Sequence, residues 1–348
     1  MKNKSFYFIW ASDISNNTGE GILGRKFLNS ILSNKDNILI NSYEKKFDLK
    51  KISDLNKINF NRTKRSFNHK YFGPLLGILF CWKNYILGKK IIFLNYLPFW
   101  NILIFLFLPP KTILGPVTGS KYLGELNSLS AFVRKYIFPI FYYLNSLILM
   151  FRYKKVIFST NLLSIYLPPQ KKFFFNFVYT LINSNKFKKK KTQFDIVIYY
   201  RNHNTKNSKN LFKILKLLSK KNYNVCVLGD KLKIKGFKNF GLINNSKVKK
   251  ILKNSKITFA SSENLFSMFI IEAINENLYV LYDNNLSNYN ELKNISSLIA
   301  LNLSNIKKTL YIIDRVIKKK KNINDFSSNK NIKKIRLNYQ NFLKDFLN

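Results

Sequence analysis

Residues 257–283 read ITFASSENLFSMFIIEAINENLYVLYD and contain a strand, a helix and a second strand in succession. The runs at 257–260 and 279–282 are short, apolar and rich in β-branched and aromatic residues, which indicates buried strands. Between them, apolar residues recur at the spacing of one helix face: Phe266, Phe269, Ile270, Ala273 and Ile274. This stripe predicts a helix over 265–275 whose apolar side packs in a core.

The same alternation extends upstream of this segment. Strands are predicted at 195–200 and 224–228, and helices are predicted at 208–220 and 247–254. Strands that alternate with helices in this way predict a doubly wound parallel sheet. The second half of the chain is therefore predicted to be a Rossmann-like α/β domain.

The first half of the chain shows a similar but less regular pattern. Four apolar strand-like runs alternate with helical stretches: 5–10, 91–96, 112–117 and 154–160. A lysine-rich run at 186–191 then breaks the pattern, and a length of 348 residues suits two domains. We therefore predict an α/β protein with an N-terminal acceptor-side domain over 1–188, a C-terminal domain over 189–329, and a helix over 330–348 that docks on the domains.

The composition is strongly basic. The chain has 60 Lys and Arg residues against 17 Asp and Glu residues, which gives a formal net charge of +43. This charge fits a polyanionic partner, but biased codon usage that fills neutral surface positions with lysine produces the same excess, so charge alone does not identify the partner. Cys81 and Cys226 lie far apart in the sequence, which indicates neither a disulfide framework nor a zinc site and fits a reducing cytosol.

Two long apolar runs in the first half could be mistaken for membrane spans. Residues 91–110 are about long enough to cross a bilayer, but Asn95, Pro98 and Asn101 interrupt them. A strand, a turn, a helix over 100–108 and a second strand account for each interruption. Lys and Arg residues border this run and the shorter one at 137–151, so we expect buried or interface-lying helices and a peripheral protein on anionic lipid at the cytoplasmic face of a membrane.

Polar residues follow the strand at 257–260. Ser261, Ser262, Glu263 and Asn264 are good turn or capping residues, and the predicted helix begins directly behind them. Open α/β sheets bind ligands beyond the carboxyl ends of their strands, and the free N–H groups at a helix start favour phosphate. The sequence therefore predicts an anion site at this end of the sheet.

The segment SSENLFSMFIIEAI resembles the signature of the retaining GT-B glycosyltransferases of the group 1, family 4 type, in which an acidic residue, a Phe-Gly-like pair and a Glu-Ala pair follow the strand. Phe266 and Glu272 fall in register. Ser267 stands where the family usually has Gly, and Asn264 stands where it has the acid, with Glu263 one residue earlier. The resemblance implies two Rossmann-like domains facing each other across a cleft.

The same resemblance implies a nucleotide-sugar donor held by the signature segment. Ser262, Glu263, Asn264 and Phe266 are the expected contacts, and Glu272 is expected to accept hydrogen bonds from the ribose hydroxyls of the donor. An ordinary solvated helix glutamate is the alternative for Glu272.

A second match to these transferases lies at the start of the same domain. YYRNHNTKN places Arg201 and Lys206 five residues apart, directly after a strand, and similar transferases have an Arg and a Lys at this spacing. Two fixed cations would stabilise the charge that the departing nucleoside diphosphate gains, so we expect no metal and no cofactor. In so basic a chain the spacing can also arise by chance, and neighbouring His203 fits a proton shuttle or a solvated loop residue.

Glycines indicate further donor contacts. Gly229 follows the strand at 224–228 and resembles the family's glycine at a strand end, where a side chain would obstruct the nucleotide. Gly19 and Gly21 lie in a predicted loop between the first strand and the first helix. By resemblance this loop faces the donor diphosphate and the acceptor across the cleft, and a plain tight turn is the alternative.

Carboxylates are scarce in the first half, so the candidates for a general base are few. Asp13 ends the first strand, Glu20 lies in the glycine loop, and Glu125 follows the predicted acceptor-side residues Thr118 and Gly119. An inverting reaction needs one of these carboxylates to deprotonate the acceptor hydroxyl. A retaining reaction, which the signature implies, needs no dedicated base because the leaving phosphate can take the proton.

Together these features predict a glycosyltransferase of the hexosyltransferase type that moves a sugar from a nucleotide-sugar donor to a lipid-linked or polysaccharide acceptor in cell-envelope glycan synthesis. A basic nucleic-acid-binding protein is one alternative, but most Phe and Tyr residues lie in apolar runs, so we expect no specific nucleic-acid partner. A membrane-anchored protein without enzymatic activity is another, and it requires that 91–110 span the bilayer.

Overall fold

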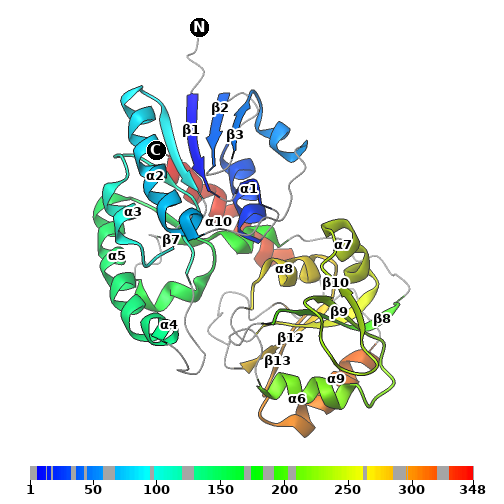
Figure 1. The fold of residues 1–348 in the computed structure, drawn as a ribbon. Coiled ribbons are helices and arrows are strands. Elements are labelled where there is room, and N and C mark those ends of the chain that lie inside the picture. The colour runs from blue at the N-terminus through cyan, green and yellow to red at the C-terminus, as the bar shows by residue number, and fades with distance from the viewer. Residues whose placement is uncertain are drawn as a thin grey trace. The chain divides into compact units, whose positions relative to one another are not determined.

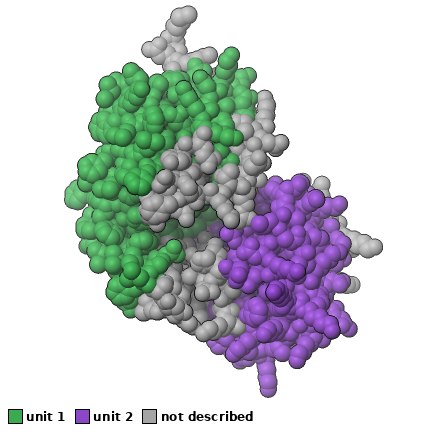
Figure 2. All heavy atoms as spheres, in the orientation of Figure 1, with its two compact units in different colours: residues 1–121, 127–178, 337–348 green, residues 122–126, 179–336 purple. Residues whose placement is uncertain are grey.

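The computed structural model of the chain describes most of its length and divides it into two compact units. The described residues are 6–12, 14–16, 19–32, 37–42, 45–57, 67–94, 98–119, 129–167, 174–182, 192–202, 209–261, 265–284, 295, 297–319 and 329–347. Unit 1 comprises residues 1–121, 127–178 and 337–348, and unit 2 comprises residues 122–126 and 179–336 (Figure 2).

Unit 1 is built on a five-stranded sheet in the order β3-β2-β1-β4-β5. Its strands are β1 (Phe6–Ala11), β2 (Asn37–Asn41), β3 (Lys46–Leu49), β4 (Lys90–Leu94) and β5 (Ile113–Leu114). Neighbouring strands run parallel except β2 and β3, which are antiparallel. The central strand β1 is buried from Phe8 to Ala11, as its apolar run predicts.

The helices of unit 1 pack around this sheet (Figure 1). They are α1 (Gly19–Ile31), α2 (Phe67–Ile86), α3 (Ile102–Phe107), α4 (Leu129–Phe132) and α5 (Phe138–Arg152), and a π-helical segment (Val133–Ile137) joins α4 to α5. Short 3-10 helices lie at Ile52–Lys57, Asn161–Tyr166 and Phe177–Leu181, the last of which includes the boundary between the units. β6 (Val156–Phe158) and β7 (Phe174–Asn176) form a separate two-stranded sheet. One core cluster gathers side chains of β1, β4, α2, α3 and α5. Within it the Phe99 ring contacts the rings of Phe105, Tyr142 and Phe158.

The two long apolar runs fold into short elements. Residues 91–110 contribute most of β4 and all of α3, and the predicted strand at 112–117 shrinks to the two residues of β5. Residues 95–97 lie outside the described part of the chain. No helix among the described residues is both long and apolar enough to cross a bilayer.

Unit 2 is built on a six-stranded, wholly parallel sheet in the order β10-β9-β8-β11-β12-β13. Its strands are β8 (Phe194–Tyr200), β9 (Val225–Gly229), β10 (Lys238–Gly241), β11 (Ser255–Phe259), β12 (Tyr279–Asp283) and β13 (Leu298–Leu301). Its helices are α6 (Lys209–Leu218), α7 (Asn245–Lys253), α8 (Met268–Asn275) and α9 (Ile306–Lys318). Counted along the chain, this is the strand order 3-2-1-4-5-6 of the Rossmann fold.

The predicted fold class, α/β with two Rossmann-like domains, is confirmed by these two sheets. The helix predicted at the C-terminus is α10 (Asn329–Leu347), whose Tyr339 and Phe342 rings contact the ring of Phe175 in β7, and whose Phe346 ring contacts that of Phe27 in α1. The predicted boundary at residue 188 lies outside the described residues and stays a prediction.

Candidate functional site

A pocket lies in unit 2 at the carboxyl ends of β8 and β11. Its walls come from the end of β8, from α6, from the residues after β11 and from Ser267 before α8: Ile198, Tyr199, Tyr200, Arg201, Leu211, Phe212, Leu215, Phe259, Ala260, Ser261 and Ser267. β8 and β11 are neighbours in the sheet, and the chain continues from β8 to β9 on one side and from β11 to β12 on the other. This is the switch point of a doubly wound sheet, where ligands of such sheets bind.

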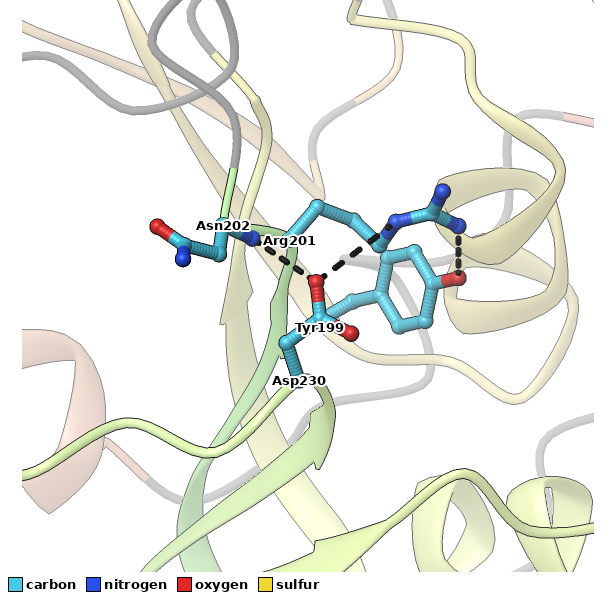
Figure 3. Close-up of polar contacts among 4 residues, drawn as sticks. All are labelled: Tyr199, Arg201, Asn202 and Asp230. Atoms are coloured by element: carbon cyan, nitrogen blue, oxygen red, sulfur yellow. Dashed lines mark hydrogen bonds and ion pairs between the residues drawn. The ribbon is translucent and has the colours of Figure 1, made fainter.

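Arg201 is the one cation among the described residues that line this pocket. Its Nη1 donates a hydrogen bond of 3.2 Å to the Tyr199 hydroxyl, and its Nε lies 4.0 Å from Asp230 Oδ2 (Figure 3). The hydrogen bond to Tyr199 raises the pKa of Arg201 above its usual range, partial burial opposes this rise, and the Asp230 carboxylate adds to it. The guanidinium is therefore held in place and remains charged.

Asp230 joins the chain after β9 to the chain after β8. Its Oδ2 accepts a hydrogen bond of 2.8 Å from the backbone N–H of Asn202 (Figure 3). Its own N–H donates a hydrogen bond of 2.9 Å to the Tyr200 carbonyl. The residue before it, Gly229, has φ +94°, and a Cβ there would lie 2.3 Å from the Tyr200 oxygen. A glycine is thus required where the ends of these two strands approach each other.

Tyr199 links Arg201 to α8, because its ring stacks on that of Phe269 at 5.2 Å between centroids. α8 begins after Ser267, whose Oγ accepts a hydrogen bond of 3.4 Å from Ile270 N. Ser267, which stands where the glycosyltransferase signature has glycine, therefore serves as a helix cap. A helix start and a guanidinium meet at one pocket, an arrangement suited to an anion.

The other signature residues in the described part of the chain have different surroundings. The Phe266 ring is 1% exposed and packs edge-on against the Tyr179 ring at 5.3 Å, so its side chain belongs to the core. Glu272 is half-buried in the middle of α8 and does not line the pocket formed by the described residues. Several predicted site residues lie outside the described residues: Asp13, Glu125, His203, Lys206, Ser262, Glu263 and Asn264.

The prediction that Gly19 and Gly21 lie in a loop of unit 1 is wrong. α1 begins at Gly19, so Gly19, Glu20 and Gly21 form the first helical turn, where the Glu20 carboxylate suits the positive end of the helix dipole. The chain between β1 and α1 is held instead by Arg25, whose Nη1 donates to the carbonyls of Ile14 at 2.6 Å and Asn16 at 3.1 Å. Burial lowers the pKa of Arg25 to about 10. Arg25 could not be singled out from the sequence, because it stands beside Lys26 in a chain with 60 Lys and Arg residues.

Thr118 and Gly119 end a tightly packed segment of unit 1. The Thr118 carbonyl accepts a hydrogen bond of 2.9 Å from Phe99 N, and a Cβ on Gly119 would lie 2.5 Å from the Leu163 side chain.

Among the described residues, no group of three or more His, Cys, Asp or Glu side chains is arranged to hold a metal.

Two Rossmann-like units, with a pocket at the switch point of the second sheet, define a GT-B type of architecture. No family model matches the sequence, and no curated protein matches it. The fold resembles that of Anabaena Alr3699/HepE, solved in complex with UDP and glucose, with TM-score 0.57, 10% identity, and coverage of 98% of this chain and 100% of that one.

Two further solved structures give the same result. The lipopolysaccharide outer core galactosyltransferase WaaB has TM-score 0.55 and 11% identity, with 98% of this chain and 99% of that chain covered. A glycosyltransferase from Rickettsia africae has TM-score 0.52 and 13% identity, with 99% and 96% covered. At these identities the likeness concerns the fold, and it confirms the predicted GT-B glycosyltransferase-like fold.

Proposed function

We propose that the protein is a glycosyltransferase that moves a sugar from a nucleoside-diphosphate sugar to an acceptor hydroxyl. One observation carries the proposal: the pocket at the carboxyl ends of β8 and β11 brings the Arg201 guanidinium and the start of α8 together at the switch point of the sheet. A diphosphate matches both groups, because the cation offsets its charge and the helix start offers free N–H groups.

In this proposal Arg201 stabilises the leaving nucleoside diphosphate. Negative charge grows on that group as the sugar bond breaks, and a guanidinium that is already oriented needs no reorganisation at that moment. Tyr199 and Asp230 hold the guanidinium, and Lys206 is proposed as a second cation. Glu272 is proposed to accept hydrogen bonds from the ribose hydroxyls.

The remaining assignments are proposals drawn from the resemblance. Gly229 and the segment Ser262, Glu263 and Asn264 would face the donor, and Gly19 and Gly21 would lie near its diphosphate. Phe266 would contribute its backbone alone, because its side chain is buried. Retention of the anomeric configuration needs no dedicated base, whereas inversion would require a carboxylate such as Asp13 or Glu20 to take the acceptor proton. Thr118, Gly119 and Glu125 are proposed for the acceptor side.

The proposed acceptor is lipid-linked or a polysaccharide, and the proposed place of action is the cytoplasmic face of a membrane, in cell-envelope glycan synthesis. Supporting this location, unit 1 exposes many large apolar side chains, including Leu79, Ile140 and Phe151. The net charge of +43 suits an anionic surface.

The decisive experiment has two stages. First, a panel of nucleoside diphosphates is scored by thermal shift, where a ligand at a hundred times its Kd stabilises the protein by about 2.7 kcal/mol. Second, the donor whose nucleotide binds is incubated with membrane extract, and release of the nucleotide is measured. Failure of every nucleotide to bind would refute the proposal, and epimerisation of the donor without an acceptor would indicate an epimerase.

A further inference from the structure

The outward face of α5 is apolar, whereas its buried face contains polar residues. Asn145 and Ser146 are buried, and Asn145 Nδ2 donates a hydrogen bond of 2.6 Å to the Phe99 carbonyl. The exposed side chains recur at the spacing of one helix face: Ile140, Tyr143, Leu144, Leu147, Met150 and Phe151. A helix that faces water has the opposite arrangement.

The same reversal occurs on α2 and continues on α3. Asn84 of α2 is buried, whereas its exposed stripe is apolar: Phe72, Leu75, Leu76, Leu79, Trp82 and Ile86. α3 exposes Leu103, Leu106 and Phe107. We call the exposed apolar residues of α2, α3 and α5 the apolar helix face.

Direct contacts join these three helices into one surface. α2 packs against α3 and α3 against α5, and Figure 1 shows all three on one flank of unit 1. Trp82 Nε1 of α2 donates a hydrogen bond of 2.8 Å to the Phe107 carbonyl at the end of α3. The Arg152 guanidinium at the end of α5 donates to the carbonyls of Phe105, Leu106 and Leu108. The exposed apolar side chains of α2, α3 and α5 therefore lie on adjoining helices.

The charges beside the apolar helix face are cationic. Lys and Arg side chains are exposed on its helices and on the segments that adjoin them: Lys83, Lys111, Arg134, Lys135 and Lys154. In the sequence, Glu125 is the one acidic residue between Asp54 and Asp195. A partner that covers this face must therefore accept apolar side chains in its middle and offer negative charge at its margin.

We infer that the apolar helix face is the surface on which the protein docks on an anionic lipid bilayer. The acyl region receives the Leu, Ile and Phe side chains, the headgroups receive the cations, and Trp82 and Tyr143 suit the boundary between them. A second copy of the chain is a poorer occupant, because two molecules of net charge +43 repel each other. The inference deepens the proposed function, on which it rests for the lipid-linked acceptor that the bilayer would supply.

The test is co-sedimentation of the full-length protein with vesicles of phosphatidylcholine alone or of equal parts phosphatidylcholine and phosphatidylglycerol. The parent protein binds the anionic vesicles and is released by salt. The triple variant Leu79→Gln/Ile140→Gln/Phe151→Gln loses at least about tenfold in binding, because three exposed apolar groups no longer enter the bilayer. The matched control Leu242→Gln/Tyr311→Gln/Leu337→Gln replaces three exposed apolar residues elsewhere and binds like the parent.

A second pair of variants tests the cationic margin. Arg134→Gln/Lys135→Gln loses roughly fivefold in binding for each charge removed, whereas Lys249→Gln/Lys253→Gln, on the exposed side of α7, keeps most of the binding. Equal binding of the parent to neutral and anionic vesicles would overturn the role of this margin.

Three other results would overturn the docking surface itself. The first is a parent that does not bind anionic vesicles, and the second is a Leu79/Ile140/Phe151 variant that binds like the parent. The third is a parent that sediments as a dimer and a variant that sediments as a monomer, which would assign the face to a second copy. Nucleotide binding by the same variants is measured by thermal shift. A protein that binds nucleotide but fails these vesicle tests contradicts the docking surface and not the proposed function.

Discussion

Asp230 accepts, through Oδ2, a 2.8 Å hydrogen bond from the backbone N–H of Asn202. A carboxylate that follows β9 thus fixes the chain directly after Arg201, and the same oxygen lies 4.0 Å from the Arg201 Nε. Asp230 is therefore a positioning residue of the proposed site. It helps to fix where the guanidinium lies and is not among the described residues that line the pocket.

Replacing Asp230 with Ala should lower kcat by about tenfold, the equivalent of one hydrogen bond to a charged group. Asp230→Asn keeps an acceptor oxygen for the Asn202 N–H and should recover most of the loss. Both variants should melt near the parent temperature, because the carboxylate is partly exposed. Unchanged turnover of Asp230→Ala, or no recovery with Asn, would contradict the positioning role.

Arg201→Ala should reduce turnover by about tenfold to a thousandfold, the range seen when a donor to developing charge is removed. Lys206→Ala is expected to fall in the same range, and Arg201→Lys should retain part of the activity because it keeps the charge but loses the planar fork. Arg315→Ala removes an exposed arginine from the far end of α9 and is the matched control. Full activity of both Arg201→Ala and Lys206→Ala would refute the proposal that these cations stabilise the leaving group.

Gly229→Ala should destabilise unit 2 more than Gly236→Ala does. Both glycines have positive φ, +94° and +87°, but a Cβ on Gly229 would lie 2.3 Å from the Tyr200 oxygen, whereas at Gly236 the nearest atom is 3.9 Å away. The positive φ alone costs about 1 kcal/mol, and the clash adds about 1–3 kcal/mol. Urea unfolding of both variants measures the difference, and equal losses would show that the two strand ends can move apart.

Glu272→Gln should weaken nucleotide binding while the protein stays folded. The amide keeps the shape of the side chain but loses the charged acceptor that ribose hydroxyls are proposed to use. Isothermal titration with the nucleotide found in the thermal-shift panel gives the affinity, and the melting temperature gives the stability. A lower melting temperature with unchanged affinity would make Glu272 a structural residue of α8.

The docking of α10 should weaken above pH 10. Burial raises the pKa of Tyr339 to about 12, against a smaller opposing effect of its hydrogen bond with Ser30. The unfolded chain loses this proton near pH 10 and the folded chain near pH 12, so the stabilisation is complete below pH 10 and is lost as pH rises to 12. The loss is about 3 kcal/mol. Tyr339→Phe should show a shallower decline in urea stability over this range, and an identical decline would place the titration elsewhere.

The second domain could be predicted from sequence because its helices and strands carry their own signals. Apolar stripes and short aliphatic runs located β8, β9, β11 and β12 within a few residues of their observed ends. β10 was missed, because Lys238–Gly241 is a largely exposed edge strand without an apolar alternation. α9 was overlooked although its signal was present: Asn305 caps it, and Thr309, Ile313, Val316 and Ile317 form its buried face.

The contacts within the candidate site could be predicted only in part. Arg201 stood out because it directly follows a strand, but its neighbour Asp230 lies 29 positions later in the sequence and meets it only because β8 and β9 pair. The loop at Gly19 and Gly21 was predicted because glycine has a low helix propensity. In the structure, packing of the buried Gly21 in the first turn of α1 outweighs that propensity. The reversed polarity of α2 and α5 could not be predicted, because it depends on which face of each helix the rest of unit 1 covers.

The contacts of α10 also determine the order in which the chain can mature during synthesis. Residues 179–336 make up nearly all of unit 2 and leave the ribosome before the last turns of α10. Most of unit 1 is translated before unit 2. The rings of Phe27, Phe175 and Phe177, however, contact rings of α10, which is translated later: Tyr339, Phe342 and Phe346. The core of unit 1 therefore stays incomplete until α10 has been translated, and a premature stop just before α10 would expose those rings to chaperones and proteases.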